Sequence, residues 1–156
     1  MTAGPVVCNS SPLIALEQIG QLDILTRLFG SILVPPAVIR ETAPPMILPG
    51  WIKEQALAQP IGGQILRASL GPGERESISL ALEIGAAWVI LDDRPARRLA
   101  QALGLPVIGT LGILLAGKRR GFLAAVKPCV DALAQHGFHI APDLYKRILA
   151  DAGESP

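Results

Sequence analysis

Five side chains with oxygen atoms stand near the ends of short apolar segments or near the starts of helical patterns: Asn9, Glu41, Glu74, Asp92 and Asp93. Asn9 and Asp92 each follow an apolar segment directly. If those segments are parallel strands, their carboxyl ends meet at one edge of a sheet, which is where open α/β sheets bind ligands. Several carboxylates at one edge would repel each other unless a cation lay between them. The spacing therefore predicts a cation site.

The chemistry of these side chains favours a hard divalent cation, Mg²⁺ or Mn²⁺. Such ions take oxygen ligands and bind to one or two carboxylates together with substrate phosphate oxygens. They activate water and stabilise charge during phosphodiester hydrolysis. This chemistry needs no histidine or cysteine, and His136 and His139 lie far along the chain from the five oxygen-bearing residues. Cys8 and Cys129 have no metal-ligand spacing and are expected to be buried, reduced thiols.

Each of these residues also has a structural explanation. Asn9 begins the sequence Asn-Ser-Ser-Pro, which is good helix-start chemistry. Glu74 would lie in a first helical turn, where the helix dipole favours an acid, and Asp92 with Asp93 would cap a helix. Glu41 alone is typical of a solvated helix. Only their joint placement favours a functional site.

The elements that must position these residues alternate between strands and helices, which predicts an α/β fold with a parallel sheet covered by helices on both faces. The expected strands cover residues 5–8, 31–34, 87–91 and 106–108. The expected helices cover residues 12–19, 22–29, 36–41, 74–84, 94–103, 110–118, 123–135 and 142–151, with Ser11 capping the first. Residues 46–70 are expected to be a variable insertion with a short helix near 51–57 and an extended stretch near 61–68.

Composition bounds the class of protein. A chain of 156 residues matches one domain, and 50% hydrophobic residues with a mean hydropathy of +0.43 predict extensive burial, part of it in a homodimer interface. No apolar run reaches the roughly 18 residues of a membrane span. The N-terminal residues lack the pattern of a secretory signal, so we expect a cytoplasmic protein.

The overall charge does not indicate a protein that coats nucleic acid. The formal net charge is +1, far from the strongly basic balance of such domains. Two local groups of cations remain, Arg94 with Arg97 and Arg98, and the run 118–120. Both are expected to be solvated helix ends.

Several segments together resemble a PIN domain, and more narrowly the uncharacterised prokaryotic branch related to VapC-type toxins. They are Val6-Val7-Cys8-Asn9-Ser10-Ser11-Pro12-Leu13-Ile14, Val34-Pro35-Pro36-Ala37-Val38 through Glu41, Leu70-Gly71-Pro72-Gly73-Glu74 with Leu80-Ala81-Leu82-Glu83, Leu91-Asp92-Asp93 through Arg97, and Gly109-Thr110-Leu111-Gly112. The resemblance runs from about Val6 to Ile140. Each motif is weak alone, and as a set they are fairly specific.

The resemblance implies a Mg²⁺- or Mn²⁺-dependent endoribonuclease on a three-layer α/β/α sandwich. The four acids of the family fall at Asn9, Glu41, Glu74 and Asp92, which are then the expected catalytic residues and metal ligands, with Asp93 as a fifth ligand. Ser11 and Thr110 match hydroxyl positions expected to order the site. RNA, a cognate antitoxin protein and a second copy of the chain are the partners that the resemblance suggests.

The chain departs from the family at its first acid, where Asn9 stands in place of Asp. An amide oxygen can ligate a hard cation but brings no charge, so it should weaken binding. This departure motivates an alternative, a degenerate domain that binds RNA or a protein partner without cutting. A phosphoacceptor receiver domain also places acids at strand ends, with a Thr and a Lys that Thr110 and Lys118 would match. That class needs an acidic pair after the first strand, where this chain has Cys8-Asn9.

Overall fold

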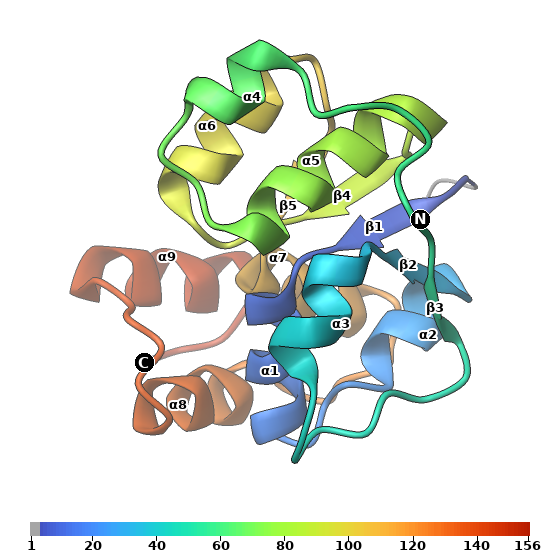
Figure 1. Ribbon diagram of the computed structural model, residues 1–156. Helices are drawn as coiled ribbons and strands as arrows, with labels where there is room; N and C mark the ends of the chain where they lie inside the picture. The colour runs from blue at the N-terminus through green and yellow to red at the C-terminus, as the bar shows by residue number, and fades with distance from the viewer. Residues whose placement is uncertain (1–3) are drawn as a thin grey trace.

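A five-stranded parallel sheet forms the centre of the molecule in the computed structural model, which describes residues 4–156 (Figure 1). Its strands are β1 (Val6–Cys8), β2 (Ile32–Val34), β3 (Ile52–Glu54), β4 (Trp88–Ile90) and β5 (Val107–Ile108), in the order β3-β2-β1-β4-β5. All four strand pairings are parallel. The four strands expected from the sequence are confirmed, and β3 adds a fifth.

Successive residues of the central strands enter different hydrophobic cores, because neighbouring side chains of a strand point to opposite faces of the sheet. Val6 and Cys8 pack into one buried cluster, and Val7 packs into the other. On the next strand, Ile90 joins the first cluster and Val89 the second. The central strands are thus buried on both faces, which explains why they read as continuous apolar runs rather than alternating ones.

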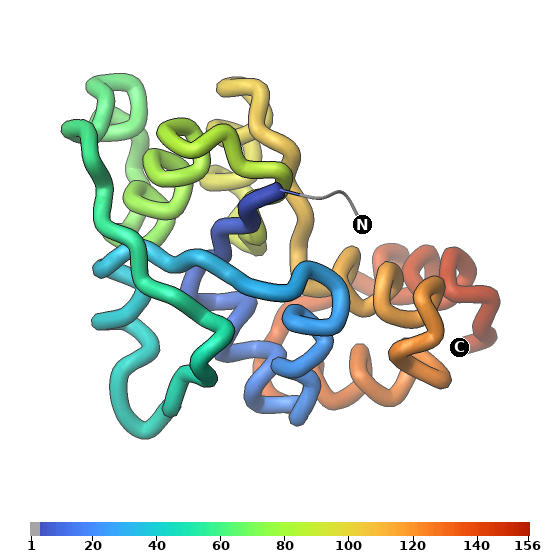
Figure 2. The backbone as a smooth tube through the Cα atoms, turned by 90° about the vertical axis from the view of Figure 1, so that its right-hand side faces the viewer, coloured from blue at the N-terminus to red at the C-terminus, as the bar shows by residue number. Residues whose placement is uncertain are grey.

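Helices cover both faces of the sheet. The helices are α1 (Ser10–Gln18), α2 (Ile24–Phe29), α3 (Pro36–Thr42), α4 (Gly63–Arg67), α5 (Pro72–Ile84), α6 (Arg94–Ala102), α7 (Thr110–Arg119), α8 (Lys127–Gln135) and α9 (Pro142–Asp151). Helices α4, α5 and α6 lie on one face, and α1, α2, α7 and α8 lie on the other (Figures 1 and 2). The fold is therefore the three-layer α/β/α sandwich that the sequence predicted. Within residues 4–156, no helix is both long and apolar enough to cross a membrane.

The strand order reverses at the boundary between β1 and β4. β2 and β3 lie on one side of β1 in the sheet, and β4 and β5 lie on its other side. Asn9 follows β1 and Asp92 comes shortly after β4, so both lie at this reversal. The Asn9 backbone N–H donates to the carbonyl oxygen of Ile90 at 3.1 Å, which extends the pairing to the end of β1. A reversal of this kind is the usual ligand site of an open parallel sheet.

The prediction for residues 46–70 was wrong in both its parts. The expected helix near 51–57 contains β3, and the expected extended stretch near 61–68 contains α4. Ile52 pairs with Ile32 of β2, a partner twenty residues earlier that a local pattern does not reveal. α4 is only five residues long, and its one buried side chain, Ile65, joins the cluster beneath α5. Contacts with the sheet and with α5, rather than local propensity, decide both elements.

Candidate functional site

Asn9 is buried with its side-chain oxygen unpaired. It precedes α1 as the N-cap residue, yet its side chain makes no capping hydrogen bond. Only 1% of the residue is exposed, and its Oδ1 accepts no hydrogen bond from any residue between Gly4 and Pro156. A buried polar atom without a partner costs roughly 1–3 kcal/mol. The capping explanation for Asn9 therefore does not account for its side chain, which is left free to bind something else.

Glu41 is held close to Asn9 by two hydrogen bonds. Its Oε1 accepts from the Ser10 hydroxyl at 2.6 Å, and its Oε2 accepts from the Gly73 backbone N–H at 3.2 Å. Gly73 lies in the first turn of α5, where backbone N–H groups have no partner within the helix and favour a negative charge. The carboxylate thus joins α1 and α3 to the start of α5.

Gly73 allows these oxygens to approach each other. A Cβ atom at this position would overlap the Glu41 carboxylate and lie 2.8 Å from Asn9 Oδ1. The Glu41 carboxylate and the unpaired Asn9 oxygen therefore converge on the same small space beside the start of α5. We call this arrangement the Asn9–Glu41 oxygen pair.

Asp92 lies across the strand reversal and is held by Thr110, the first residue of α7. Its Oδ1 accepts from the Thr110 backbone N–H at 2.8 Å, and its Oδ2 accepts from the Thr110 hydroxyl at 2.6 Å. Burial raises the pKa of Asp92, and the two hydrogen bonds from Thr110 and the nearby Arg97 act in the opposite direction. Burial, with a smaller contribution from the Asp92 charge, raises the pKa of Cys8 at the end of β1. Burial is thus the larger effect on Asp92, and the contacts with Thr110 and Arg97 offset only part of it.

Arg97 positions the segment that carries Asp92. Its Nη1 donates to the carbonyl oxygen of Leu91 at 2.8 Å, and the side chain is partly buried. A Cβ atom on Gly109 would lie 2.7 Å from that nitrogen and 2.9 Å from Asp92 Oδ1, so glycine is needed there for the same reason as at Gly73. Arg97 is therefore not the solvated helix end that the sequence predicted.

Among residues 4–156, the other predicted site residues make no hydrogen bond to these two groups. The Glu74 carboxylate folds back beside Gly71 and has no hydrogen-bond or ion-pair partner within the part of the chain that the structure describes. Asp93 is exposed and caps α6, accepting from the Ala96 backbone N–H at 3.0 Å. Ser11 is also exposed, and the hydroxyl that donates to Glu41 is that of Ser10, so the ordering role of Ser11 stays a prediction.

Glu41, Glu74 and Asp92 do not form a three-carboxylate metal site within the described residues. Among residues 4–156, no three His, Cys, Asp or Glu side chains lie together as the ligands of one metal ion would. The structure instead brings together two oxygen-bearing groups, the Asn9–Glu41 oxygen pair and the Asp92–Thr110 pair, at the ends of adjacent strands. The predicted metal roles of Glu74 and Asp93 stay predictions.

The donor set nevertheless fits a hard cation better than any other group. Asn9 Oδ1 is buried and unpaired, it lies beside a carboxylate, and a second carboxylate follows the adjacent strand. Mg²⁺ commonly binds through one or two carboxylates and keeps several waters, so it does not require a cage of protein ligands. Asn9, Glu41 and Asp92 are the residues that could hold such an ion.

A groove of about 1000 Å³ opens beside Asp92. Asp92, Arg94 and Arg97 form one wall, and β5 with the start of α7 forms the floor. The other wall runs from Phe138 to Ile148 and consists of α9 with the loop before it. We call this the α9 groove; the helices α6, α7 and α9, which contribute lining residues, are labelled in Figure 1.

The α9 groove adds residues that sequence reasoning missed. His139 was expected to lie away from the acidic loops, yet it lines the same groove as Asp92. Arg147 also lines this groove, although it is remote from Asp92 in sequence. No local motif marks either residue. Only the return of α9 to the sheet brings them there.

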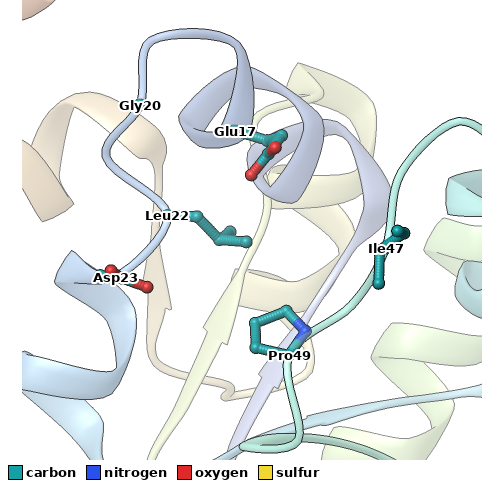
Figure 3. A pocket seen from close by; sticks show the side chains of 6 residues that line it. All are labelled: Glu17, Gly20, Leu22, Asp23, Ile47 and Pro49. Atoms are coloured by element: carbon teal, nitrogen blue, oxygen red, sulfur yellow. The ribbon is translucent and has the colours of Figure 1, made fainter.

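A smaller pocket of about 280 Å³ lies elsewhere, lined by residues of the α1–α2 connection and of the loop before β3: Glu17, Gly20, Leu22, Asp23, Ile47 and Pro49 (Figure 3). Pro49 precedes β3, so this pocket lies near the amino end of that strand. The Asn9–Glu41 oxygen pair and Asp92 lie at the opposite edge of the sheet. This pocket is therefore separate from the candidate site.

Comparison with known proteins identifies the family. No curated protein and no solved structure matches the chain. A family model described as a PIN domain matches residues 5–154, which covers every strand and helix of the fold. PIN domains are generally a nuclease fold that uses divalent metals. The position of the candidate site at the strand reversal agrees with that assignment, and the chain belongs to the PIN-domain family.

Proposed function

We propose that this protein is a Mg²⁺- or Mn²⁺-dependent endoribonuclease of the VapC-like PIN type. The observation that carries the proposal is the buried, unpaired Asn9 oxygen beside the Glu41 carboxylate, next to the strand that leads to Asp92. Asn9, Glu41 and Asp92 would hold the metal, with Glu74 as the fourth predicted ligand. When bound there, the ion supplies an activated water and stabilises charge on the phosphodiester.

The chain's own residues would prepare this site before substrate arrives. Ser10 and the Gly73 N–H fix the Glu41 carboxylate, and Thr110 fixes both oxygens of Asp92. Arg97 holds the carbonyl of Leu91 and so restrains the segment that carries Asp92. Groups that orient metal ligands in this way commonly contribute 10- to 100-fold to metal affinity, as a rough figure.

Calorimetric titration with Mn²⁺ tests the metal site directly. The wild-type protein is compared with Asp92→Asn and Glu41→Gln, and Glu17→Gln serves as the matched control because Glu17 is exposed at the end of α1. We expect binding in the wild type and in Glu17→Gln, and weaker or absent binding in the other two. Equal binding in all four proteins would contradict the proposed ligands.

Cleavage of RNA in Mn²⁺ tests the reaction. The wild type and Glu17→Gln should cut an RNA substrate, and Asp92→Asn should not. Activity that survives Asp92→Asn would come from another site or from a contaminating nuclease. Failure of every protein to cut, with metal binding intact, would leave the metal site in place but remove support for the nuclease.

The second candidate function is a degenerate PIN domain that binds RNA or a protein partner without cutting. Asn9 at the position of the first family acid favours it, because an amide oxygen contributes no negative charge to the site. Asn9→Asp distinguishes the two candidates. In a merely weakened nuclease this substitution should raise Mn²⁺ affinity and activity together, whereas a higher affinity without activity would favour the non-catalytic candidate.

A further inference from the structure

The α9 groove has a surplus of positive charge. Three arginines line it, Arg94, Arg97 and Arg147, against the two acids Asp92 and Asp143, and His139 lies among them. Among the residues that the structure describes, none of the three arginines forms a salt bridge. Arg94 and Arg147 are exposed, and they stand on opposite walls of the groove. The groove therefore has more arginines than acids, although the whole chain has a net charge of only +1.

The floor of the groove is apolar, and the α9 wall carries apolar side chains beside its polar and charged ones. Val107 and Ile108 of the edge strand and Leu111 of α7 form the floor, and Phe138 and Leu144 line the facing wall. All five side chains are partly exposed, so they remain accessible. Apolar and aromatic surface between cationic walls suits a ligand that combines flat, apolar faces with a chain of anions. Unpaired nucleotides have this combination, because their bases stack on aromatic rings while arginines bind the phosphates.

We propose that the α9 groove is the subsite that holds unpaired nucleotides beyond the bond to be cut, with Arg94 and Arg147 at backbone phosphates and a base against Phe138. This rests on the proposed function, because Asp92 at one wall then lies where the strand enters the metal site. A duplex keeps its bases stacked inside and offers none to the floor. The subsite therefore selects single-stranded over double-stranded RNA.

Binding measured without metal tests the subsite separately from catalysis. The probe is a fluorescent single-stranded oligoribonucleotide in EDTA, followed by anisotropy, with the same sequence as a duplex for comparison. Arg94→Ala and Arg147→Ala are compared with Arg119→Ala, which removes an equal charge at the exposed end of α7. Arg147→Lys keeps the charge and reports whether charge alone is enough. Circular dichroism verifies that each variant is folded.

The expected result is tighter binding of the single strand than of the duplex. Arg94→Ala and Arg147→Ala should each weaken single-strand binding by roughly five-fold or more, and Arg119→Ala should not. The slope of log affinity against log salt should fall by about 0.7 for each lost phosphate contact. Phe138→Leu should weaken the single strand and leave the salt slope unchanged.

Three outcomes would overturn the subsite. They are equal loss in Arg119→Ala and Arg147→Ala, equal affinity for single strand and duplex, and binding of an acidic peptide in the groove with no binding of RNA. Failure of the proposed function has a different signature, in which the groove variants bind as expected but no protein cuts RNA in Mn²⁺. If Arg94→Ala and Arg147→Ala leave cleavage unaffected, the proposed nuclease activity would be supported and the proposed subsite contradicted.

Discussion

At the scale of single residues, the site is made by two close approaches of side chains to backbone. Gly73 admits the Glu41 carboxylate and the Asn9 oxygen, and Gly109 admits Arg97 and Asp92. Neither glycine has a positive φ, so backbone conformation does not require glycine at these positions. Space for the Glu41, Asn9 and Asp92 oxygens requires it.

Gly73→Ala should therefore damage the site although alanine is the better helix former. In an open helix position this change would stabilise by roughly 0.5–1 kcal/mol. Here the new Cβ atom would overlap the Glu41 carboxylate, so we expect lower thermal stability and loss of Mn²⁺ binding by calorimetry. Gly50→Ala is the control, because nothing lies within 4 Å of a Cβ atom at that position. Unchanged Mn²⁺ affinity in Gly73→Ala would contradict the assignment of the Asn9–Glu41 oxygen pair.

Asp92→Asn should separate function from stability. Burial raises the pKa of Asp92, so its charge is costly in the folded protein, and an amide can still accept from the Thr110 N–H. We expect the free energy of unfolding at pH 7 to be unchanged or to rise by something on the order of 1 kcal/mol, while metal binding is lost. Chemical denaturation measures the first quantity. A large destabilisation would mean that Asp92 is needed for folding.

Thr110→Val tests the residue that holds Asp92. It removes the 2.6 Å hydroxyl contact and keeps the backbone contact and nearly the same volume. We expect Mn²⁺ affinity to fall roughly 10- to 100-fold, as for other groups that orient metal ligands. An unchanged affinity would show that the backbone N–H alone orients the carboxylate.

At the scale of elements, the end of the chain fixes the helix that forms one wall of the groove. The Glu154 carboxylate accepts from Lys118 Nζ at 2.8 Å and from the backbone N–H groups of Val126 and Lys127 at 2.7 and 3.0 Å. These contacts join the segment after α9 to the end of α7 and the start of α8. Because α9 carries Arg147, they also set the shape of the α9 groove.

Glu154→Gln should make the protein less stable at neutral pH but not in strong acid. Hydrogen bonds from Lys118, Val126 and Lys127 lower the pKa of Glu154 from 4.5 to about 2. A lowered carboxyl pKa contributes stability that is fully present above the unfolded value and is lost as pH falls through the folded one. The difference in melting temperature between wild type and variant should therefore be present at pH 7 and shrink between about pH 4.5 and about 2. A difference that does not change with pH would exclude this ionic contribution.

At the scale of the whole molecule, the homodimer suggested by the high apolar fraction stays a prediction. Three large hydrophobic side chains in residues 4–156 are prominently exposed, Ile47 at 89%, Leu66 at 50% and Leu82 at 41%. Leu66 and Leu82 lie on α4 and α5, which contact each other. We expect light scattering at high concentration to give the mass of two chains, and Leu66→Glu to shift it toward one. A monomeric mass for the wild type at high concentration would contradict the homodimer.

The sequence by itself determined four of the five strands, most of the helices and the placement of Asn9 and Asp92 after neighbouring strands. Strands buried on both faces are continuous apolar runs, and proline and glycine mark the helix starts and ends, so these signals are local. Because parallel strands end at one edge, the placement of Asn9 and Asp92 at that edge followed from the alternation of elements. The close approach of Thr110 to Asp92 agrees with the predicted ordering role, which itself stays untested.

Only the tertiary structure decided which oxygens meet. Glu41 accepts hydrogen bonds from Ser10 and Gly73, and Asp93 accepts one from the backbone of its own helix. These choices depend on distances between elements that are far apart in sequence. For the same reason the sequence did not predict β3, which pairs with β2. It also did not predict the α9 groove, which forms because α9 packs against α7. Local patterns specify elements, whereas contacts between distant elements specify the site.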